Sequence, residues 1–249
     1  MSSVVDEETD GFEEASGPPK ERWRSRKKQK TKPNRGLAKA PHGEALLEYF
    51  RRIYLSVQPP ADQGLVPSIG ITSAVSGEGR TTIATGVAAA MAADLDRSIV
   101  LVEVDLAHPG VHQLLGINPE PGLAEYLRGE CALSEAVHQI SDKLFVLPAG
   151  DGAKEAPNLI YRLARADLRS RMNTSDALLV LDLPPVFTTS YGVLAASMAE
   201  ALVFVVHAGS TTDDEVRESL TRLGENSVRS IVVNGYQPQL PNWLQNLAE

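Results

Sequence analysis

The sequence predicts a doubly wound α/β domain in which helices cover both faces of a mostly parallel sheet. Six short runs are nearly continuously apolar, and segments with helical spacing separate most of them. Strands that are apolar on both faces are typical of a buried parallel sheet. A glycine-containing loop follows the first run and leads directly into an alanine-rich helix. With 249 residues and 43% hydrophobic content, the chain fits one folded domain, residues 42–249, better than two.

The first 41 residues differ in composition from the rest. Residues 1–19 carry six acidic and no basic side chains, whereas residues 20–39 carry ten basic side chains and a single acid. Because few apolar side chains accompany these charges, we expect residues 1–41 to form a disordered arm. Its basic part is either a solubilising tail or a contact with anionic lipid, nucleic acid or a partner. The remaining residues carry 14 basic and 25 acidic side chains, so nucleic acid is not the expected partner.

The elements of the domain can be placed in order. Apolar residues spaced for one helical face begin after Gly43, and Pro59 and Pro60 mark the end of that helix. The apolar runs predict strands over residues 68–73, 98–105, 143–150, 177–182, 201–206 and 230–235. The segments between them predict helices over residues 81–95, 122–128, 133–140, 156–172, 190–198 and 211–224. Near the C-terminus, Trp243, Leu244 and Leu247 predict a further short helix that packs on the domain.

The loop after the first strand has the composition of a phosphate-binding loop. Its sequence is Ala74-Val-Ser-Gly-Glu-Gly-Arg-Thr-Thr. In such a loop, glycines let backbone N–H groups turn toward phosphates, the following helix contributes its dipole, and a hydroxyl binds Mg²⁺. The usual pattern of Ala or Gly, four residues, Gly-Lys and then Ser or Thr is met except that Arg80 replaces the lysine. A loop with two glycines before a helix also occurs as an ordinary turn, so further evidence is needed.

Acidic residues at two predicted strand ends supply that evidence. Glu103 and Asp105 lie on one face of the strand 98–105, and Asp182 ends the strand 177–182. In open α/β sheets, ligands bind beyond the carboxyl ends of the strands. A carboxylate that follows an apolar run needs a cation or hydrogen bonds to offset its desolvation. Magnesium bound to a nucleotide would supply that cation.

Six segments of the chain together resemble one family. They are 73-SAVSGEGRTT, 101-LVEVDLAHPGVHQLLG, 122-GLAEYLRGE, 146-VLPAG, 178-LLVLDLPPV and 203-VFVVHAGSTTDDEV. In order and spacing they are similar to the bacterial tyrosine kinases of capsule and exopolysaccharide synthesis. These kinases lie within the wider superfamily of division-site-selection and chromosome-partitioning P-loop ATPases. The resemblance covers about residues 44–236.

The resemblance implies ATP or ADP with Mg²⁺ as the ligand, and it assigns roles to residues at matching positions. The residues expected to bind the nucleotide are Gly77, Glu78, Gly79, Arg80, Thr81, Thr82 and Asn234, the last on the adenine side. The residues expected at the metal are Thr81, Asp105 and Asp182, and those expected to act in catalysis are Arg80, Glu103 and Asp105. The helix with Glu48, Arg51 and Tyr54 resembles the family's oligomerisation motif, so we expect Glu48 and Arg51 to contact a neighbouring subunit or partner.

The chain also departs from the family at positions that matter for catalysis. Arg80 is positive like the lysine it replaces, but its planar fork is bulkier than a compact ammonium and could misplace the transferring phosphoryl group. Glu103 is one methylene longer than the usual Asp. Three more positions differ from the common residues: Ala107, His108 and Leu183. No tyrosine cluster follows Tyr236, so self-phosphorylation of a C-terminal tail is not expected.

These observations favour a degenerate tyrosine-kinase-like protein that binds Mg-nucleotide with little or no turnover. The resemblance implies that it would regulate polysaccharide synthesis through a membrane chain-length or co-polymerase protein. Two alternatives stay open: a working tyrosine kinase or ATPase in which Arg80 is functional, and a positioning-type ATPase anchored by residues 20–39. We expect a cytoplasmic protein, peripheral at the inner face of the membrane, because the lone Cys131 excludes an internal disulfide and no apolar run suits a secretion signal.

Overall fold

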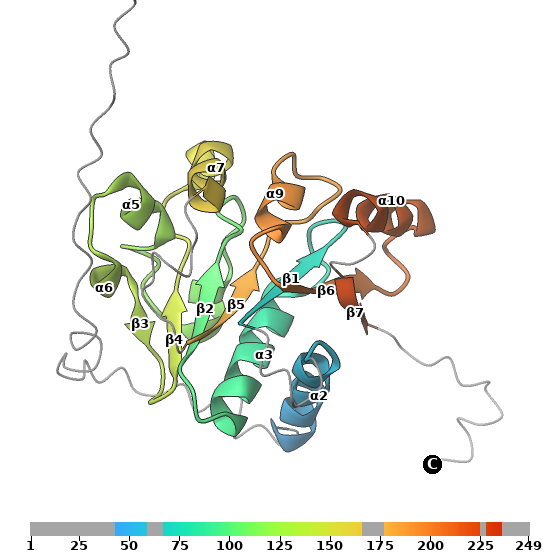
Figure 1. Ribbon diagram of the computed structural model, residues 1–249, viewed down its shortest axis with the longest axis horizontal. Helices are drawn as coiled ribbons and strands as arrows, with labels where there is room; N and C mark the ends of the chain where they lie inside the picture. The colour runs from blue at the N-terminus through green and yellow to red at the C-terminus, as the bar shows by residue number, and fades with distance from the viewer. Residues whose placement is uncertain (1–42, 59–66, 166–176, 225–227, 236–249) are drawn as a thin grey trace, which may run out of the picture.

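A mixed sheet lies between two layers of helices (Figure 1). The computed structural model describes residues 43–58, 67–165, 177–224 and 228–235. The predicted arm and the predicted helix around Trp243 lie outside the described residues, so both stay predictions.

All six predicted runs agree with strands to within three residues, and one further short strand, at residues 138–139, was not predicted. The strands are β1 (Ser68–Ser73), β2 (Ile99–Glu103), β3 (His138–Gln139), β4 (Leu144–Leu147), β5 (Leu178–Asp182), β6 (Ala201–His207) and β7 (Val228–Asn234). Their order in the sheet is β3-β4-β2-β5-β1-β6-β7. All neighbours pair in parallel except β3, which is antiparallel to β4. The mostly parallel sheet that was predicted is thereby confirmed.

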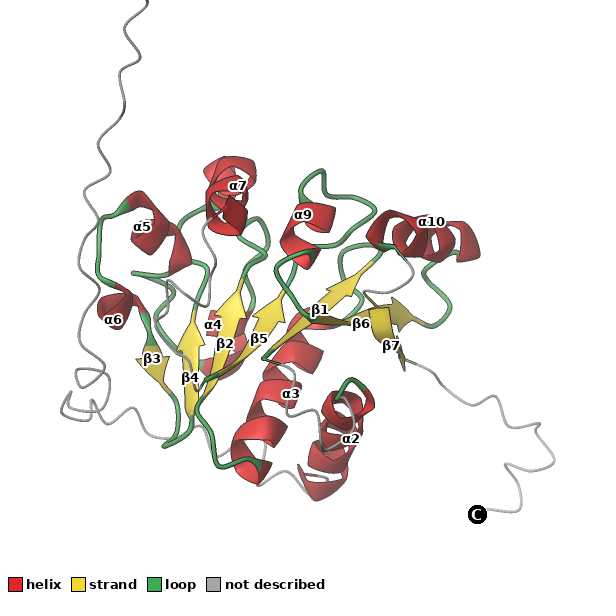
Figure 2. Ribbon diagram, in the orientation of Figure 1, coloured by secondary structure: helices red, strands yellow, loops and turns green. Residues whose placement is uncertain are grey.

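The helices fall on both faces of this sheet (Figure 2). In chain order they are α2 (Gly43–Ser56), α3 (Arg80–Asp94), α4 (Val111–Leu115), α5 (Leu123–Arg128), α6 (Leu133–Ala136), α7 (Ala156–Arg165), α9 (Gly192–Ala196) and α10 (Asp213–Leu223), with a 3-10 turn at Ala153–Glu155. One apolar core joins α2, α3 and α4 to the sheet, and a second joins α5, α6, α7 and α9 to its other face. Two cores on opposite faces are what a doubly wound fold requires.

The chain reverses direction across the sheet at β1. From β1 it proceeds to β2 and β4 on one side, and from β5 it crosses β1 to reach β6 and β7 on the other. In such sheets, ligands bind at the carboxyl ends of the strands where the order reverses. The topology therefore selects the carboxyl ends of β1, β2 and β5 as the place to look for a site.

One predicted helix is shorter in the structure, and another continues into residues that the structure does not describe. The helix predicted over 133–140 is wrong beyond Ala136, because Val137 adopts an extended backbone and residues 138–139 pair with β4. The helix predicted over 156–172 is described only to Arg165, and its remainder lies outside the described residues. Helix α4 was not predicted. It has five residues, too few to show a helical period after Pro109 and Gly110.

Among the described residues, no helix has both the length and the apolarity that a membrane span requires.

Candidate nucleotide-binding site

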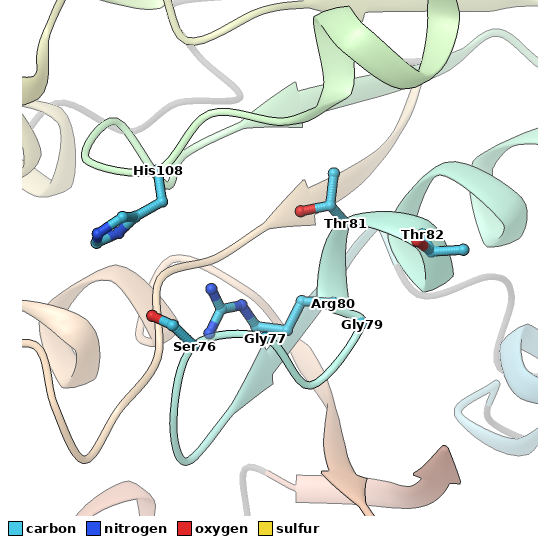
Figure 3. Close-up of a pocket in the computed structure, with 7 residues that line it drawn as sticks. All are labelled: Ser76, Gly77, Gly79, Arg80, Thr81, Thr82 and His108. Atoms are coloured by element: carbon cyan, nitrogen blue, oxygen red, sulfur yellow. The ribbon is translucent and has the colours of Figure 1, made fainter. Parts of the chain in front are cut away.

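The loop between β1 and α3 has the backbone that its glycines predict. Gly77 and Gly79 have φ values of 87° and 95°, a left-handed conformation that favours glycine. Gly79 is required for a second reason, because a Cβ at this position would collide with the amide of Asn234. A pocket of about 270 Å³ opens over the loop (Figure 3). Its lining residues are Ser76, Gly77, Gly79, Arg80, Thr81, Thr82 and His108.

The Arg80 side chain turns back along the loop instead of pointing outward (Figure 3). It is 7% exposed, so its charge depends on partners within the protein. Its Nη1 donates to the Ser73 hydroxyl at 2.8 Å and to the Val75 carbonyl at 3.1 Å. Its Nη2 donates to Asp105 at 2.9 Å, which forms a buried ion pair. Separating such a pair costs about 3–5 kcal/mol, so Arg80 is anchored in this position.

Asp105 lies two residues beyond the end of β2, whereas the sequence predicted a strand that includes it. One carboxylate oxygen accepts from Arg80, and the other accepts from the backbone N–H of His108 at 3.2 Å. The imidazole of His108 lies across the pocket from the loop, on the segment between β2 and α4 (Figure 3). Sequence reasoning gave His108 no role in the site, although it lies in a segment that the resemblance quotes.

Asp182 is a buried carboxyl group without a hydrogen-bond partner of ordinary geometry. Its side chain is almost fully buried at the end of β5, and neither oxygen is bonded. Burial raises the pKa of Asp182 to about 7, while the Arg80 charge and the nearby Thr81 hydroxyl lower it. A buried, unpartnered carboxyl group at a strand end is unusual, and it calls for a cation or a water at that point.

Glu103 bonds backbone groups of the protein, and its expected catalytic role stays a prediction. In the sheet its backbone is level with that of Asp182. Its Oε1 accepts from the N–H groups of Gly110 and Val111 at the start of α4, and its Oε2 accepts from Ala149 N at 3.0 Å. Glu103 is fully buried, and its carboxylate bonds these three backbone groups. Glu103 is not among the residues that line the pocket. In this structure, Glu103 joins α4 to the segment after β4.

Two predicted nucleotide ligands, Asn234 and Glu78, make hydrogen bonds that hold the loop. Asn234, at the end of β7, donates its side-chain amide to the Glu78 carbonyl at 2.9 Å. The Glu78 carboxylate accepts from the Val75 N–H at 2.8 Å and from residues near the end of β6. Neither Asn234 nor Glu78 lines the pocket, so their expected direct contacts with a nucleotide stay predictions.

The predicted oligomerisation residues have partners within the chain. Arg51 forms two bonds with Asp94 at the end of α3, at 2.6 and 2.8 Å, and one with Glu48 at 2.6 Å. The Tyr54 hydroxyl also donates to Asp94, at 2.8 Å. These contacts join α2 to α3, and contact with a second copy stays untested.

The residues that meet at the carboxyl ends of β1, β2 and β5 fit Mg-nucleotide. Thr81 offers a half-buried hydroxyl to the pocket, and Asp182 beside it has oxygens that lack partners. Within the described residues, no group of three or more His, Cys, Asp and Glu side chains could enclose a metal. A magnesium ion here would therefore be bound mainly through phosphate oxygens and water, which is usual for Mg²⁺ at nucleotides.

Comparisons with known proteins agree with the fold. No protein-family model matches the chain. Tyrosine-protein kinase YwqD of Bacillus subtilis is 23% identical over 191 residues, which cover 76% of this chain and 80% of YwqD. The succinoglycan biosynthesis transport protein ExoP of Rhizobium meliloti is 30% identical over 179 residues, or 69% of this chain. The chain spans 23% of the length of ExoP.

Three solved structures share the fold. The kinase domain of Escherichia coli tyrosine kinase ETK has a TM-score of 0.68 at 22% identity, covering 80% of this chain and 77% of that domain. The cell division ATPase MinD of Pyrococcus furiosus has a TM-score of 0.58 at 19% identity, covering 74% and 79%. Cobyrinic acid a,c-diamide synthase of Mycobacterium smegmatis, with a bound ATP analogue and magnesium, has a TM-score of 0.56 at 19% identity, covering 74% and 81%. The chain is thus a homologue of the bacterial tyrosine-protein kinases, with the fold of the MinD-like P-loop ATPases.

Proposed function

We propose that this protein is a degenerate relative of the bacterial tyrosine kinases, which binds Mg-nucleotide at the loop 74–82 and turns it over slowly. One observation carries the proposal. A glycine-containing loop with the backbone of a phosphate loop lies beside an unpartnered carboxyl group, Asp182, while the only cation of the loop, Arg80, is already bonded to protein acceptors. The first feature supports binding, and the second argues against rapid phosphoryl transfer.

Binding draws on groups that are free to act. The backbone N–H groups around Gly77 and Gly79 and the N-terminus of the 15-residue helix α3 attract phosphate oxygens. The Thr81 hydroxyl and the Asp182 carboxylate would bind the magnesium ion, directly or through water. The ion would neutralise phosphate charge and compensate the buried carboxylate.

Phosphoryl transfer requires positive charge where negative charge develops in the transition state. To reach the transferring phosphoryl group, Arg80 would have to leave Asp105, which would then be buried without its partner. That separation costs about 3–5 kcal/mol, equivalent to a factor of a hundred or more in rate. Glu103, the expected second carboxylate, already bonds three backbone N–H groups. Both departures slow the chemistry more than they weaken binding.

The names of the relatives also suggest the cellular process in which this protein would act. YwqD is named a tyrosine-protein kinase, and ExoP is named a succinoglycan biosynthesis transport protein. By analogy, we infer that this chain regulates the synthesis or export of an envelope polysaccharide at the cytoplasmic face of the membrane, through a membrane co-polymerase partner. Because the match spans only part of ExoP, the partner and the polymer are part of the proposal.

The test is calorimetry with ATP, with and without Mg²⁺, run beside assays of phosphate release and phosphotyrosine. The proposal predicts Mg-dependent binding with slow release of phosphate. Absence of binding at millimolar ATP would reject the nucleotide site. Turnover in the range typical of kinases, about 1–100 s⁻¹, would favour the working-enzyme alternative.

A further inference from the structure

Glu78 has a side chain that the proposed binding reaction does not use directly. It lies in the loop between Gly77 and Gly79, yet it is 1% exposed and is not among the residues that line the pocket. A carboxylate buried to this degree is stable only where several donors reach it. Its surroundings therefore indicate what it does.

Three donors reach the Glu78 carboxylate, and they come from two separate segments. The backbone N–H of Val75, at the start of the loop, donates to Oε2 at 2.8 Å. The backbone N–H of His207 donates to Oε1 at 3.1 Å, and the Thr211 hydroxyl donates to the same oxygen. His207 ends β6, and Thr211 lies two residues before α10. The carboxylate therefore bonds the loop both to itself and to the segment 207–211.

The backbone of Glu78 adds a third connection. Its carbonyl accepts from the Asn234 amide at the end of β7, and that amide packs against Gly79. Residue 78 thus links the ends of β1, β6 and β7. Its two neighbours are glycines in the left-handed conformation, so the loop would be free to change shape without these bonds.

We propose that Glu78 is a positioning residue, which fixes the phosphate loop in its phosphate-binding shape by joining it to the segment 207–211 between β6 and α10. The proposal rests on nucleotide binding at loop 74–82. It assigns Glu78 an indirect role, because its carboxylate meets backbone N–H groups and a hydroxyl while other residues line the pocket.

The variant Glu78→Gln separates this role from a simple effect of charge. Removing a negative charge near bound phosphates would by itself strengthen their binding. Positioning predicts the opposite, because the two carboxylate oxygens accept from different backbone N–H groups, at Val75 and His207. A glutamine has one acceptor oxygen, so one N–H group would face an NH₂ donor and lose its bond.

The experiment measures calorimetric affinities of the full chain for pyrophosphate and for Mg-ADP. Glu78→Gln should bind both at least about tenfold more weakly than the unmodified protein, as expected for the loss of a hydrogen bond to a charged group. Thr211→Val should weaken both, and Thr211→Ser, which keeps the hydroxyl, should restore them. Glu44→Gln removes an exposed acid of α2 and should change neither affinity.

Hydrogen exchange of the loop provides a readout without nucleotide. In Glu78→Gln, the backbone amides of residues 75–82 should exchange about tenfold faster than in the unmodified protein. Unchanged exchange, or affinities in Glu78→Gln equal to or tighter than the original, would overturn the proposal. If Glu78→Gln does not fold, equal affinities of Thr211→Val and the unmodified protein would overturn it. If the unmodified protein binds neither pyrophosphate nor Mg-ADP, the proposed function fails, and exchange still decides the role of Glu78.

Discussion

Replacement of Asp182 by asparagine should stabilise the nucleotide-free protein while it impairs the site. Asp182 is buried at the end of β5 without a hydrogen-bond partner of ordinary geometry. Its ionised form is therefore costly in the absence of a cation. Asparagine has nearly the same shape and cannot ionise, so it removes this cost.

The magnitude follows from the shift in pKa. Burial raises the pKa of Asp182 from 3.8 to about 7, against the lowering effect of Arg80. For a carboxyl group whose pKa is higher in the folded state, ionisation opposes folding. Stability is then greatest below about pH 4 and falls as pH rises to 7, above which the loss is constant. At about 1.4 kcal/mol per pKa unit, the total is about 4 kcal/mol, of which about 2–3 kcal/mol falls between pH 5 and pH 8.

The assay is urea unfolding of the nucleotide-free protein and of Asp182→Asn at pH 5 and pH 8. The free-energy advantage of the variant should grow by about 2–3 kcal/mol between these values. Other titrating groups are common to both proteins and cancel in the comparison. Asp142→Asn, which removes an exposed acid, should show no such growth. An advantage for Asp182→Asn that is the same at both pH values would refute the reasoning.

Three further predictions concern the loop and the arm. Arg80→Lys should raise ATP turnover by about tenfold or more in a phosphate-release assay. The reason is that an ammonium lacks the planar fork with which Arg80 bonds Asp105 and Ser73 at the same time. Thr81→Ala should weaken the Mg²⁺-dependent part of ATP binding while EDTA-treated samples of both proteins bind alike, as calorimetry would show. The full chain should associate with anionic vesicles in a salt-sensitive way, because each basic residue near the surface contributes about 1 kcal/mol of attraction. Removal of residues 1–41 should abolish this association, and equal flotation of the full and shortened proteins would contradict the prediction.

Much of the fold could be predicted because parallel strands and their helices have local signatures. The runs at β2, β5 and β6 are apolar up to a polar last residue, and the described strands match them to within a few residues. The antiparallel strand β3 could not be predicted, because two residues show no period and depend on β4 for pairing. For the same reason the predicted helix 133–140 was extended too far.

The site was harder to predict than the fold, because its residues come together only through the sheet. The register of β2 and β5 brings Glu103 and Asp182 to the same level, as strand ends suggested. No local pattern indicates that Glu103 would bond the start of α4, or that Arg80 would turn back to Asp105. These contacts join segments more than five residues apart, and the side chains involved have more than one possible partner. The sequence predicts which residues form the site, and the packing decides their partners.

The most direct test of slow turnover is a single-turnover experiment with γ-labelled ATP, Mg²⁺ and an excess of the purified full chain. The account predicts that ATP binds and that the bound label stays on intact ATP for minutes. Transfer of the label to phosphate or to tyrosine within seconds, at the rates typical of kinases, would contradict it.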